Sequence, residues 1–305
     1  MSKPIRNISE GRFKRRIINR YPVNSMNDPN DNKTNLNPST HKESNIETRV
    51  VEVEDNGFYK LHNDFENDSS KYDVEVGFLI VATGKYDIFL WPLIQSIEKY
   101  FLPNNRKFYN IFSDKDINLP IDNYEVFHIE HKPFPYPTLY RFHFFNKYIN
   151  QIIGDQLVYI DSDTLITNNI GTEIIYPRVV TQHCGYVNRV GTFENDERSK
   201  TRVERIKQKN YYGGGFYSFE RYEFYDLMES CISMIDQDSS NGIVPVWHDE
   251  SALNKYMSET EPSVVLSPSY HYPEDVEHIY NLWGGKEKYV CKVLLLNKNH
   301  KEIRE

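Results

Sequence analysis

A chain of 305 residues, of which 39% are hydrophobic and 14% aromatic, can bury a sizeable core, and one large domain with an extension fits it better than two domains. The formal net charge of −8 argues against a nucleic-acid partner, because proteins that bind the phosphate backbone normally present a basic face. No apolar run reaches the roughly 18 residues of a transmembrane segment and no apolar signal core opens the sequence, so we expect a soluble, cytoplasmic protein.

The first part of the chain is polar and rich in Asn, Ser, Pro and charged residues. Such a composition buries too little apolar area to offset the entropy lost on ordering, so we expect residues 1–70 to form a largely disordered extension and linker. Residues 71–305 are then the folded domain. The cysteines, Cys184, Cys231 and Cys291, match neither a disulfide framework nor a zinc-binding spacing and fit a reducing compartment.

Strands and helices are predicted to alternate from residue 76 onward. The expected strands are Val76–Ala82, Phe108–Phe112, Tyr124–Ile129 and Leu157–Ile160. The expected helices are Ile88–Tyr100, which has apolar residues at helical spacing, and the aromatic-rich Thr138–Tyr148. This alternation predicts an α/β fold with a mostly parallel, Rossmann-like central sheet flanked by helices, and a ligand crevice at the carboxyl ends of the strands.

Two acidic segments follow predicted strands, at the expected crevice. These are Ser113-Asp114 and Asp161-Ser162-Asp163. In an extended segment, residues i and i+2 project to one side, so Asp161 and Asp163 can converge on one hard cation. A divalent ion with open positions accepts diphosphate oxygens and stabilises a departing nucleotide. Asp-X-Asp also occurs in ordinary loops, and that interpretation stays open.

A further helix is predicted to begin near Asp249, because Leu253, Tyr256 and Met257 stand at helical spacing. The residues Trp247-His248-Asp249-Glu250 come directly before or at its start. One interpretation is structural, since an acid at the N-cap and another in the first turn satisfy the backbone N–H groups and the helix dipole. The other is a sugar site, in which an aromatic face packs on the pyranose while carboxylates hold hydroxyls and face the anomeric carbon.

Several short blocks form a recognisable pattern. In chain order they are Val81-Ala82-Thr83-Gly84-Lys85-Tyr86, Asp161-Ser162-Asp163, Tyr211-Tyr212-Gly213-Gly214-Gly215-Phe216, Trp247-His248-Asp249-Glu250-Ser251, Leu253-Asn254-Lys255-Tyr256, Leu266-Ser267-Pro268 and Lys298-Asn299-His300. Over residues 73–305 the sequence resembles glycosyltransferase family 6, the family of the blood-group A and B transferases and the α-1,3-galactosyltransferase, in a soluble bacterial or phage-type form.

The resemblance implies a GT-A fold and a retaining hexosyltransferase. The enzyme would move α-linked N-acetylgalactosamine, or galactose, from its UDP donor to the 3-OH of a β-galactoside-containing glycan acceptor. Two aspartates at positions 161 and 163 match the metal-binding pair of the metal-dependent members, so the implied cofactor is Mn²⁺, with Mg²⁺ as the alternative.

The resemblance also assigns the donor site residue by residue. Val81, Thr83 and Tyr86 match positions that hold the uracil and ribose, although Tyr86 would also serve as a core aromatic. The other donor-binding matches outside the glycines are Arg141, Asp161, Ser162, His248, Asp249, Lys298 and Arg304. Lys298 and Arg304 would place cations where negative charge grows on the departing diphosphate, whereas without the resemblance they would be interpreted as part of a solvated tail.

Gly213, Gly214 and Gly215 match the positions around the C2 substituent of the donor sugar. Three glycines leave room for an acetamido group, so UDP-N-acetylgalactosamine is the preferred donor; a flexible loop is the alternative interpretation. Glu250 matches the catalytic carboxylate on the β side of the anomeric carbon, acting by covalent attack or by stabilising an oxocarbenium-like ion. The matched acceptor-binding residues are His183, Trp247 and Glu250.

The sequence departs from the family pattern near the acceptor site. Ala252 replaces a histidine of the mammalian enzymes, and Ser269-Tyr270-His271-Tyr272-Pro273 replaces Glu-Tyr-X-Trp-Asp. The identity of the acceptor therefore does not follow from the resemblance. Two other functions stay open: a UDP-sugar hydrolase, in which water replaces a poorly bound acceptor, and a non-catalytic galactoside-binding module on the same fold.

Overall fold

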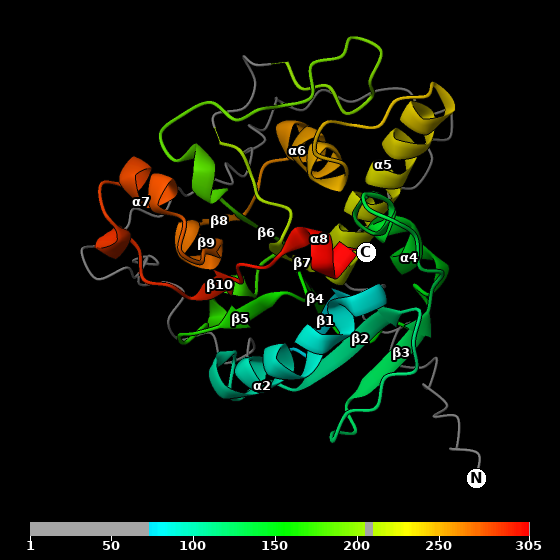
Figure 1. Ribbon diagram of the computed structural model, residues 1–305. Helices are drawn as coiled ribbons and strands as arrows, with labels where there is room; N and C mark the ends of the chain where they lie inside the picture. Colours follow the sequence, from blue (N-terminus) through cyan, green and yellow to red (C-terminus); the bar gives the residue numbers. More distant parts are fainter. Residues whose placement is uncertain (1–72, 205–209, 305) are drawn as a thin grey trace, which may run out of the picture. The chain divides into compact units, whose positions relative to one another are not determined.

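The computed structural model describes residues 73–204 and 210–304, which belong to one compact unit, residues 46–305. The extension predicted for residues 1–70 lies outside the described residues. The predicted folded domain contains an α/β architecture with a central sheet between layers of helices (Figure 1). In the part of the chain that the structure describes, no helix has the length and apolar character needed to cross a membrane.

The main sheet has seven strands in the order β3-β2-β1-β4-β7-β6-β8. The strands are β1 (Val76–Val81), β2 (Lys107–Ser113), β3 (Tyr124–His128), β4 (Gln156–Ile160), β6 (Arg178–Thr181), β7 (Phe216–Glu220) and β8 (Val264–Leu266). β3, β2, β1 and β4 are parallel, and β6 is parallel to β8, whereas β7 runs antiparallel to both β4 and β6. The mostly parallel sheet of a GT-A fold is thus confirmed.

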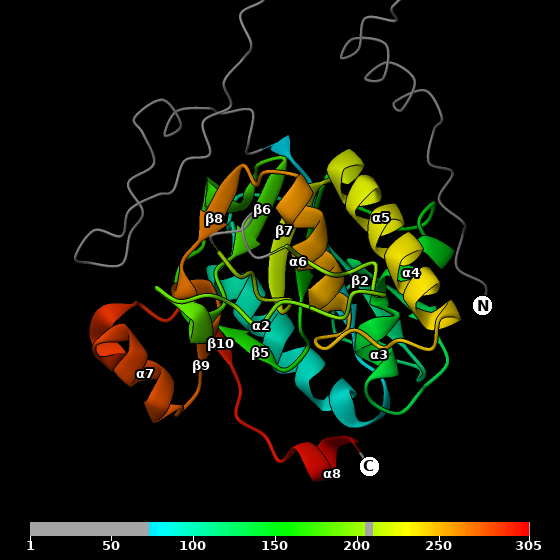
Figure 2. The same ribbon diagram turned by 90° about the horizontal axis from the view of Figure 1, so that it is seen from above.

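Helices cover both faces of this sheet because the strand side chains alternate between two apolar layers. Phe78 and Ile80 of β1 pack in the layer that contains α2 (Leu90–Tyr100), while Leu79 faces the other layer. That second layer contains α4 (Arg141–Lys147), α5 (Arg221–Ser240) and α6 (Asp249–Glu259). Both views place α2 on the opposite side of the sheet from α5 and α6 (Figures 1 and 2).

A second, three-stranded sheet in the order β5-β10-β9 brings the C-terminal tail to the main sheet. Its strands are β5 (Thr164–Ile166), β9 (Tyr272–Pro273) and β10 (Val293–Leu295), and α7 (Glu277–Trp283) and α8 (His300–Arg304) flank it in sequence. Leu295 of β10 pairs with Thr164 of β5, and the backbone N–H of Leu296 donates to the carbonyl of Asp163 at 3.1 Å. This register places the tail beside the residues that follow β4.

Two predicted helices have different boundaries. The predicted helix Thr138–Tyr148 is divided into α3 (Tyr136–Leu139) and α4, with Tyr140 between them at φ −100° and ψ 16°. The Arg141 Nε–H group donates to the carbonyl of Thr138 at 3.3 Å, and this bond turns the buried guanidinium back across the junction. The predicted helix Ile88–Tyr100 begins at Leu90, because Gly84–Phe89 forms a 3₁₀ segment, η2.

The helix predicted to begin near Asp249 is confirmed as α6. Leu253 and Met257 are buried in the layer beneath it, and Tyr256 lies at the edge of the same layer. Its N-cap position, however, is His248, with φ 55° and ψ −123°, and among the described residues no side chain caps this N-terminus. Asp249 therefore does not occupy the N-cap, but Asp249 and Glu250 both lie in the first turn, where the helix dipole favours acids.

Candidate active site

A cavity of about 270 Å³ opens where β1 and β4 end, at the carboxyl edge of the parallel part of the sheet. Parallel strands end at the same edge, so their following loops meet there. The predicted site residues that line the cavity are Val81, Thr83, Tyr86, Arg141, Asp161, Ser162, Asp163, Lys298 and Arg304. The structure thus brings the predicted nucleotide, metal and diphosphate residues to one cavity.

The loop after β1 is held by the loop after β2. The backbone N–H of Gly84 donates to Asp114 Oδ1 at 2.8 Å, and Gly84 has φ +60°, a conformation that glycine adopts without strain. Lys115 Nζ forms an ion pair with Asp87 at 2.9 Å. Asp114, expected near the crevice from its place at a strand end, therefore fixes the turn that presents Thr83 to the cavity.

Arg141 connects the cavity to the start of α6. Its Nε lies 3.0 Å from Asp249 Oδ2, and its Nη1 donates to the carbonyl of Gly214 at 3.0 Å. The same Nη1 is 3.6 Å from Asp161 Oδ1, and the guanidinium stacks 4.2 Å from the ring centroid of Tyr159. Burial acts to lower the pKa of Arg141, but the carboxylates of Asp249 and Asp161 outweigh burial and raise it, so the guanidinium stays charged.

Asp249 is almost fully buried, with 1% of its surface exposed. Burial raises the pKa of its carboxyl to about 7, and the neighbouring Arg141 opposes that rise. Strongly shifted pKa values occur at functional sites and in structural ion pairs alike. The pairing with Arg141 joins this acid to a residue that lines the cavity.

The three predicted glycines form a strip that connects Asp161 to Glu250. The backbone N–H of Asp161 donates to the carbonyl of Gly215 at 3.0 Å, and the N–H of Gly214 donates to Glu250 Oε2 at 2.7 Å. A Cβ atom on Gly215 would lie 2.9 Å from Asp161 Oδ2, and one on Gly214 would lie 3.2 Å from the Cβ of Glu250. Side chains at these positions would therefore fill the space between the two acids.

Glu250 itself does not line the cavity, and neither do the glycines, Asp249 or the predicted acceptor residues. Its Oε2 accepts a hydrogen bond from the N–H of Gly214, the middle glycine, whose carbonyl Arg141 binds from the cavity side. Asp161 is bonded to the next glycine, Gly215, so Asp161 and Glu250 contact neighbouring residues of the strip.

The pair Asp161 and Asp163 offers hard oxygen ligands of the type that Mg²⁺ and Mn²⁺ prefer. Asp161 Oδ1 accepts a hydrogen bond from the Tyr159 hydroxyl at 2.5 Å, and the Asp161 side chain is 36% exposed. The Lys298 ammonium group forms an ion pair with Asp163 Oδ2. The donor set fits a divalent cation provided that Lys298 releases Asp163, because the ammonium and the cation compete for one carboxylate.

The C-terminal tail contributes Lys298, Ile303 and Arg304 to the lining of the cavity. Burial lowers the pKa of Lys298, whose ammonium lies 5.6 Å from the ring centroid of Tyr86. The Arg304 guanidinium stacks 3.7 Å from the ring centroid of Phe134, and Lys85 Nζ donates to the carbonyl of Glu302 at 2.7 Å. These contacts hold α8 against η2 and the loop after β3, as Figure 1 shows for α8.

The cavity also contains residues that the sequence interpretation did not select. They are His131, Lys132, Phe134, Pro137, Thr138, Tyr159 and Ile303. The residues from His131 to Phe134 follow β3, which is parallel to β1 and β4, so the strand-end rule that selected Asp161 would also have selected this loop. No strand-end pattern in the sequence pointed to the other cavity residues, which are Pro137, Thr138, Tyr159 and Ile303.

The predicted acceptor residues do not line the cavity, and neither does His248, which the sequence assigned to the donor site. Trp247 is 43% exposed, and the His248 ring packs edge-to-face on Phe134, which lines the cavity, with centroids 5.2 Å apart. His183 Nδ1 accepts a hydrogen bond from the Gly185 N–H at 3.0 Å, so in the neutral ring Nε2 carries the hydrogen. Burial lowers the pKa of His183, while the charge of Glu250 acts to raise it.

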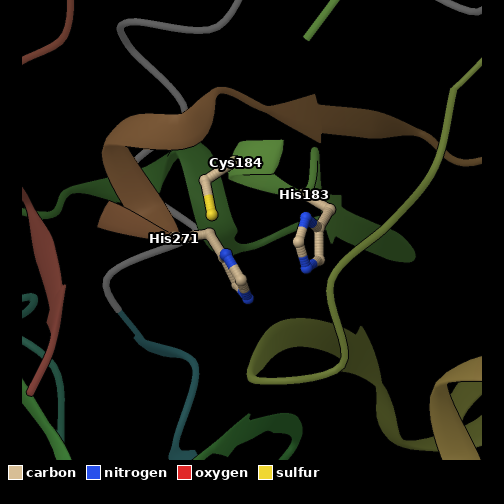
Figure 3. A group of neighbouring side chains, drawn as sticks. All are labelled: His183, Cys184 and His271. Atoms are coloured by element: carbon tan, nitrogen blue, oxygen red, sulfur yellow. The ribbon is translucent and has the colours of Figure 1, made fainter. Parts of the chain in front are cut away.

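His183 belongs to a cluster with Cys184 and His271 that the sequence interpretation did not anticipate (Figure 3). The nitrogen and sulfur atoms of the three side chains lie within 4.8 Å of one another, and soft donors of this type bind zinc. Two features oppose such a role: the Gly185 N–H already occupies His183 Nδ1, and burial raises the pKa of the Cys184 thiol to about 12. The cluster as built is a packed polar group rather than a ready metal site.

Comparison with known proteins matches the model of glycosyltransferase family 6 to residues 9–305. The chain is 26% identical over 249 residues to histo-blood group ABO system transferase 1 of Rattus norvegicus, covering 75% of this chain and 68% of the relative. It is 26% identical over 250 residues to globoside alpha-1,3-N-acetylgalactosaminyltransferase 1 of Gallus gallus, covering 76% and 70%. It is 28% identical over 208 residues to O-antigen biosynthesis glycosyltransferase WbnI of Escherichia coli, covering 65% and 88%. The family model spans nearly the whole chain, and the chain therefore belongs to glycosyltransferase family 6.

Proposed function

We propose that this glycosyltransferase moves α-N-acetylgalactosamine, or α-galactose, from its UDP donor to the 3-OH of a β-galactoside, with retention at the anomeric carbon. Family membership makes the protein a hexosyltransferase with a nucleotide-sugar donor and a glycan acceptor. The proposal of donor and linkage rests on the position of Arg141, which contacts Asp161, Gly214 and Asp249. These contacts support a nucleotide site at Asp161 that is adjacent to a sugar site at Gly214 and Asp249.

The cavity at the strand ends suits the nucleotide and its diphosphate. Val81, Thr83 and Tyr86 would enclose the uracil and ribose, while Lys298 and Arg304 bring positive charge from the tail. Asp161 and Asp163 would hold a divalent cation, which stabilises negative charge on the leaving diphosphate. When donor enters, we expect Lys298 to transfer from Asp163 to a phosphate oxygen, because the two anions compete for one ammonium.

The glycine strip suits the transferred hexose. A sugar lying over it would have the diphosphate toward Asp161 and its β face toward Glu250. The bond from C1 to the diphosphate oxygen breaks with its electron pair leaving on UDP, the acceptor 3-oxygen forms the new bond to C1, and the proton of that hydroxyl passes to an oxygen of the departing diphosphate. Glu250 either stabilises the oxocarbenium-like ion or attacks C1 covalently, in which case the acceptor oxygen then displaces Glu250 from C1. Asp249 holds sugar hydroxyls.

UDP-N-acetylgalactosamine is the preferred donor in this proposal. Gly213, Gly214 and Gly215 present no side chain of their own to the sugar, which favours a donor with an acetamido group at C2. The relative from Gallus gallus, matched at 26% identity, is named for transfer of N-acetylgalactosamine. On the acceptor side, the exposed indole of Trp247 supplies an apolar face for a galactoside, and the His183 Nε2–H group supplies a donor for a hydroxyl.

Radiolabelled UDP-N-acetylgalactosamine and UDP-galactose, each incubated with a panel of β-galactosides, test the proposal. Labelled oligosaccharide with an α-1,3 linkage, identified by NMR, is the expected product. Free labelled sugar as the main product would instead identify a UDP-sugar hydrolase. Binding of galactosides without turnover of either donor, with and without Mn²⁺, would identify a non-catalytic module.

A further inference from the structure

The side chain of His271, which lies between the 3₁₀ segment Pro268–Tyr270 and β9, occupies the space beside Gly213. A Cβ atom on Gly213 would lie 2.6 Å from His271 Cδ2 and 2.7 Å from His271 Nε2. Such distances are far below van der Waals contact. A side chain at position 213 and an imidazole at position 271 are therefore mutually exclusive in this backbone arrangement.

The same imidazole also reaches toward Gly215, the last glycine of the strip. A Cβ atom on Gly215 would lie 3.7 Å from His271 Nε2 and 2.9 Å from Asp161 Oδ2. His271 Nε2 is thus directed at the part of the strip nearest the predicted metal and diphosphate residues. Figure 3 shows the ring extending away from the backbone beside His183 and Cys184.

The protonation of His271 follows from its surroundings. The residue is 7% exposed, and its Nδ1 is buried with no hydrogen-bond partner among the described residues. Burial, with a smaller contribution from His183, lowers the pKa of the ring well below its usual value, so the ring is neutral. A neutral imidazole carries one N–H group, and a buried N–H without an acceptor is rarer than a buried acceptor without a donor. We therefore assign the hydrogen to Nε2.

We propose that His271 is a specificity-determining residue, which donates its Nε2–H to an oxygen on the substituent of the transferred hexose that faces Gly213 and Gly215. This inference rests on the proposed function, in which the hexose lies over the glycine strip. An acetamido group brings a carbonyl oxygen within reach of this position, whereas a hydroxyl is shorter. The imidazole therefore favours the N-acetylated donor, because a donor sugar without that oxygen leaves a buried N–H unsatisfied.

Replacement of His271 tests the inference through the ratio of kcat/KM for UDP-N-acetylgalactosamine to kcat/KM for UDP-galactose. We expect His271→Leu to lower this ratio about tenfold or more, since it keeps the bulk but removes the N–H donor. His271→Gln supplies an amide N–H and should keep the ratio within about threefold of the unchanged protein. The Kd for UDP should change less than about twofold in both variants, because the imidazole faces the sugar region.

Cys184→Ala is the matched control, because Cys184 belongs to the same cluster, whereas the atoms nearest to a Cβ on Gly213 all belong to His271. In this control variant, the ratio of kcat/KM for UDP-N-acetylgalactosamine to kcat/KM for UDP-galactose should equal that of the unchanged protein. An unchanged ratio in folded His271→Leu protein overturns the inference while leaving the proposed function intact. Failure of the unchanged protein to transfer from either donor overturns the proposed function itself. Stoichiometric zinc in the purified protein that is lost in His271→Gln would also overturn the inference, because the ring would then be a metal ligand.

Substitutions that move the side chain from position 271 to position 213 give a second test. This test also applies if His271→Leu fails to fold. Gly213→Ala alone should reduce use of both donors, because the new Cβ meets the imidazole. Adding His271→Gly to Gly213→Ala should restore transfer from UDP-galactose without restoring the preference for the N-acetylated donor. Recovery of that preference in the double variant would contradict a role for the imidazole.

Discussion

The two ends of the site are built in different ways. At the end that we propose for the nucleotide, side chains from strand ends and from the C-terminal tail line a cavity, and the Asp161 side chain is 36% exposed. At the end that we propose for the sugar, Asp249 is 1% exposed and Glu250 accepts a hydrogen bond from the backbone of Gly214. We therefore expect substitution of exposed cavity residues to leave the fold intact, and substitutions that affect Asp249 to change stability together with activity.

The largest effect is expected at Arg141, where the two ends meet. Arg141→Met leaves the buried Asp249 carboxylate without its cation, which should cost about 3–5 kcal/mol of unfolding free energy and abolish turnover. Urea denaturation and donor turnover measure the two effects. Lys255→Met removes the ion pair with Glu259 on the surface of α6 and should cost about 0.5 kcal/mol or less. Equal stability losses in the two variants would contradict the coupling of catalysis to stability at the sugar end.

Glu250→Gln tests the sugar end without changing its shape. Because the amide cannot supply the negative charge that the transition state needs, we expect transfer to fall about 100- to 1000-fold. UDP affinity, measured by calorimetry, should stay within about twofold, since Glu250 does not line the nucleotide cavity. Glu259→Gln, on the same helix, is the control. Full transfer by Glu250→Gln would exclude Glu250 as the catalytic carboxylate.

Asp163→Asn tests the nucleotide end. Removing one of two carboxylates should weaken Mn²⁺ binding by about tenfold or more, as measured by electron paramagnetic resonance in the presence of UDP. Asp116→Asn, at an exposed site after β2, is the control. Unaltered Mn²⁺ affinity would locate the cation elsewhere.

Asp249 should also make stability at the sugar end depend on pH. Its folded-state pKa is raised to about 7 from a usual value of 3.8, so the folded protein holds a proton that the unfolded chain releases. Its contribution to stability is then fully present below the unfolded pKa and is lost as pH rises through about 7. Denaturation at several pH values should show that wild-type stability falls relative to Asp249→Asn across this window. A constant difference would contradict the raised pKa.

The smallest effect is expected from Lys85→Met. This change removes the contact between Lys85 Nζ and the carbonyl of Glu302, which helps to hold α8 over the cavity. The contact is exposed, so we expect donor KM to rise only about two- to threefold with kcat unchanged. Steady-state kinetics measure this, and Lys301→Met in the same helix is the control. A fall in kcat as large as that of Glu250→Gln would show that tail closure limits turnover.

Sequence reasoning predicted much of the nucleotide end. Buried strands are apolar runs of the right length, and the strand-end rule places the residues after them at one edge, which located Asp161 and Asp163. The resemblance to the family added Arg141, Lys298 and Arg304, which all line the cavity. The loop containing His131 and Lys132 follows a predicted strand as well, so it was open to the same rule.

Local pattern determined the strands, the helix after Asp249 and the acidic tripeptide, because periodicity and residue type act over neighbouring positions. Only the tertiary structure decided which distant segments meet. The pairing of β10 with β5 brings Lys298 to Asp163, the turn at Tyr140 directs Arg141 to Asp249, and the glycine at position 213 leaves space for His271. Each of these contacts joins segments that lie far apart in the sequence, so it depends on strand pairing and side-chain packing that neighbouring residues do not specify.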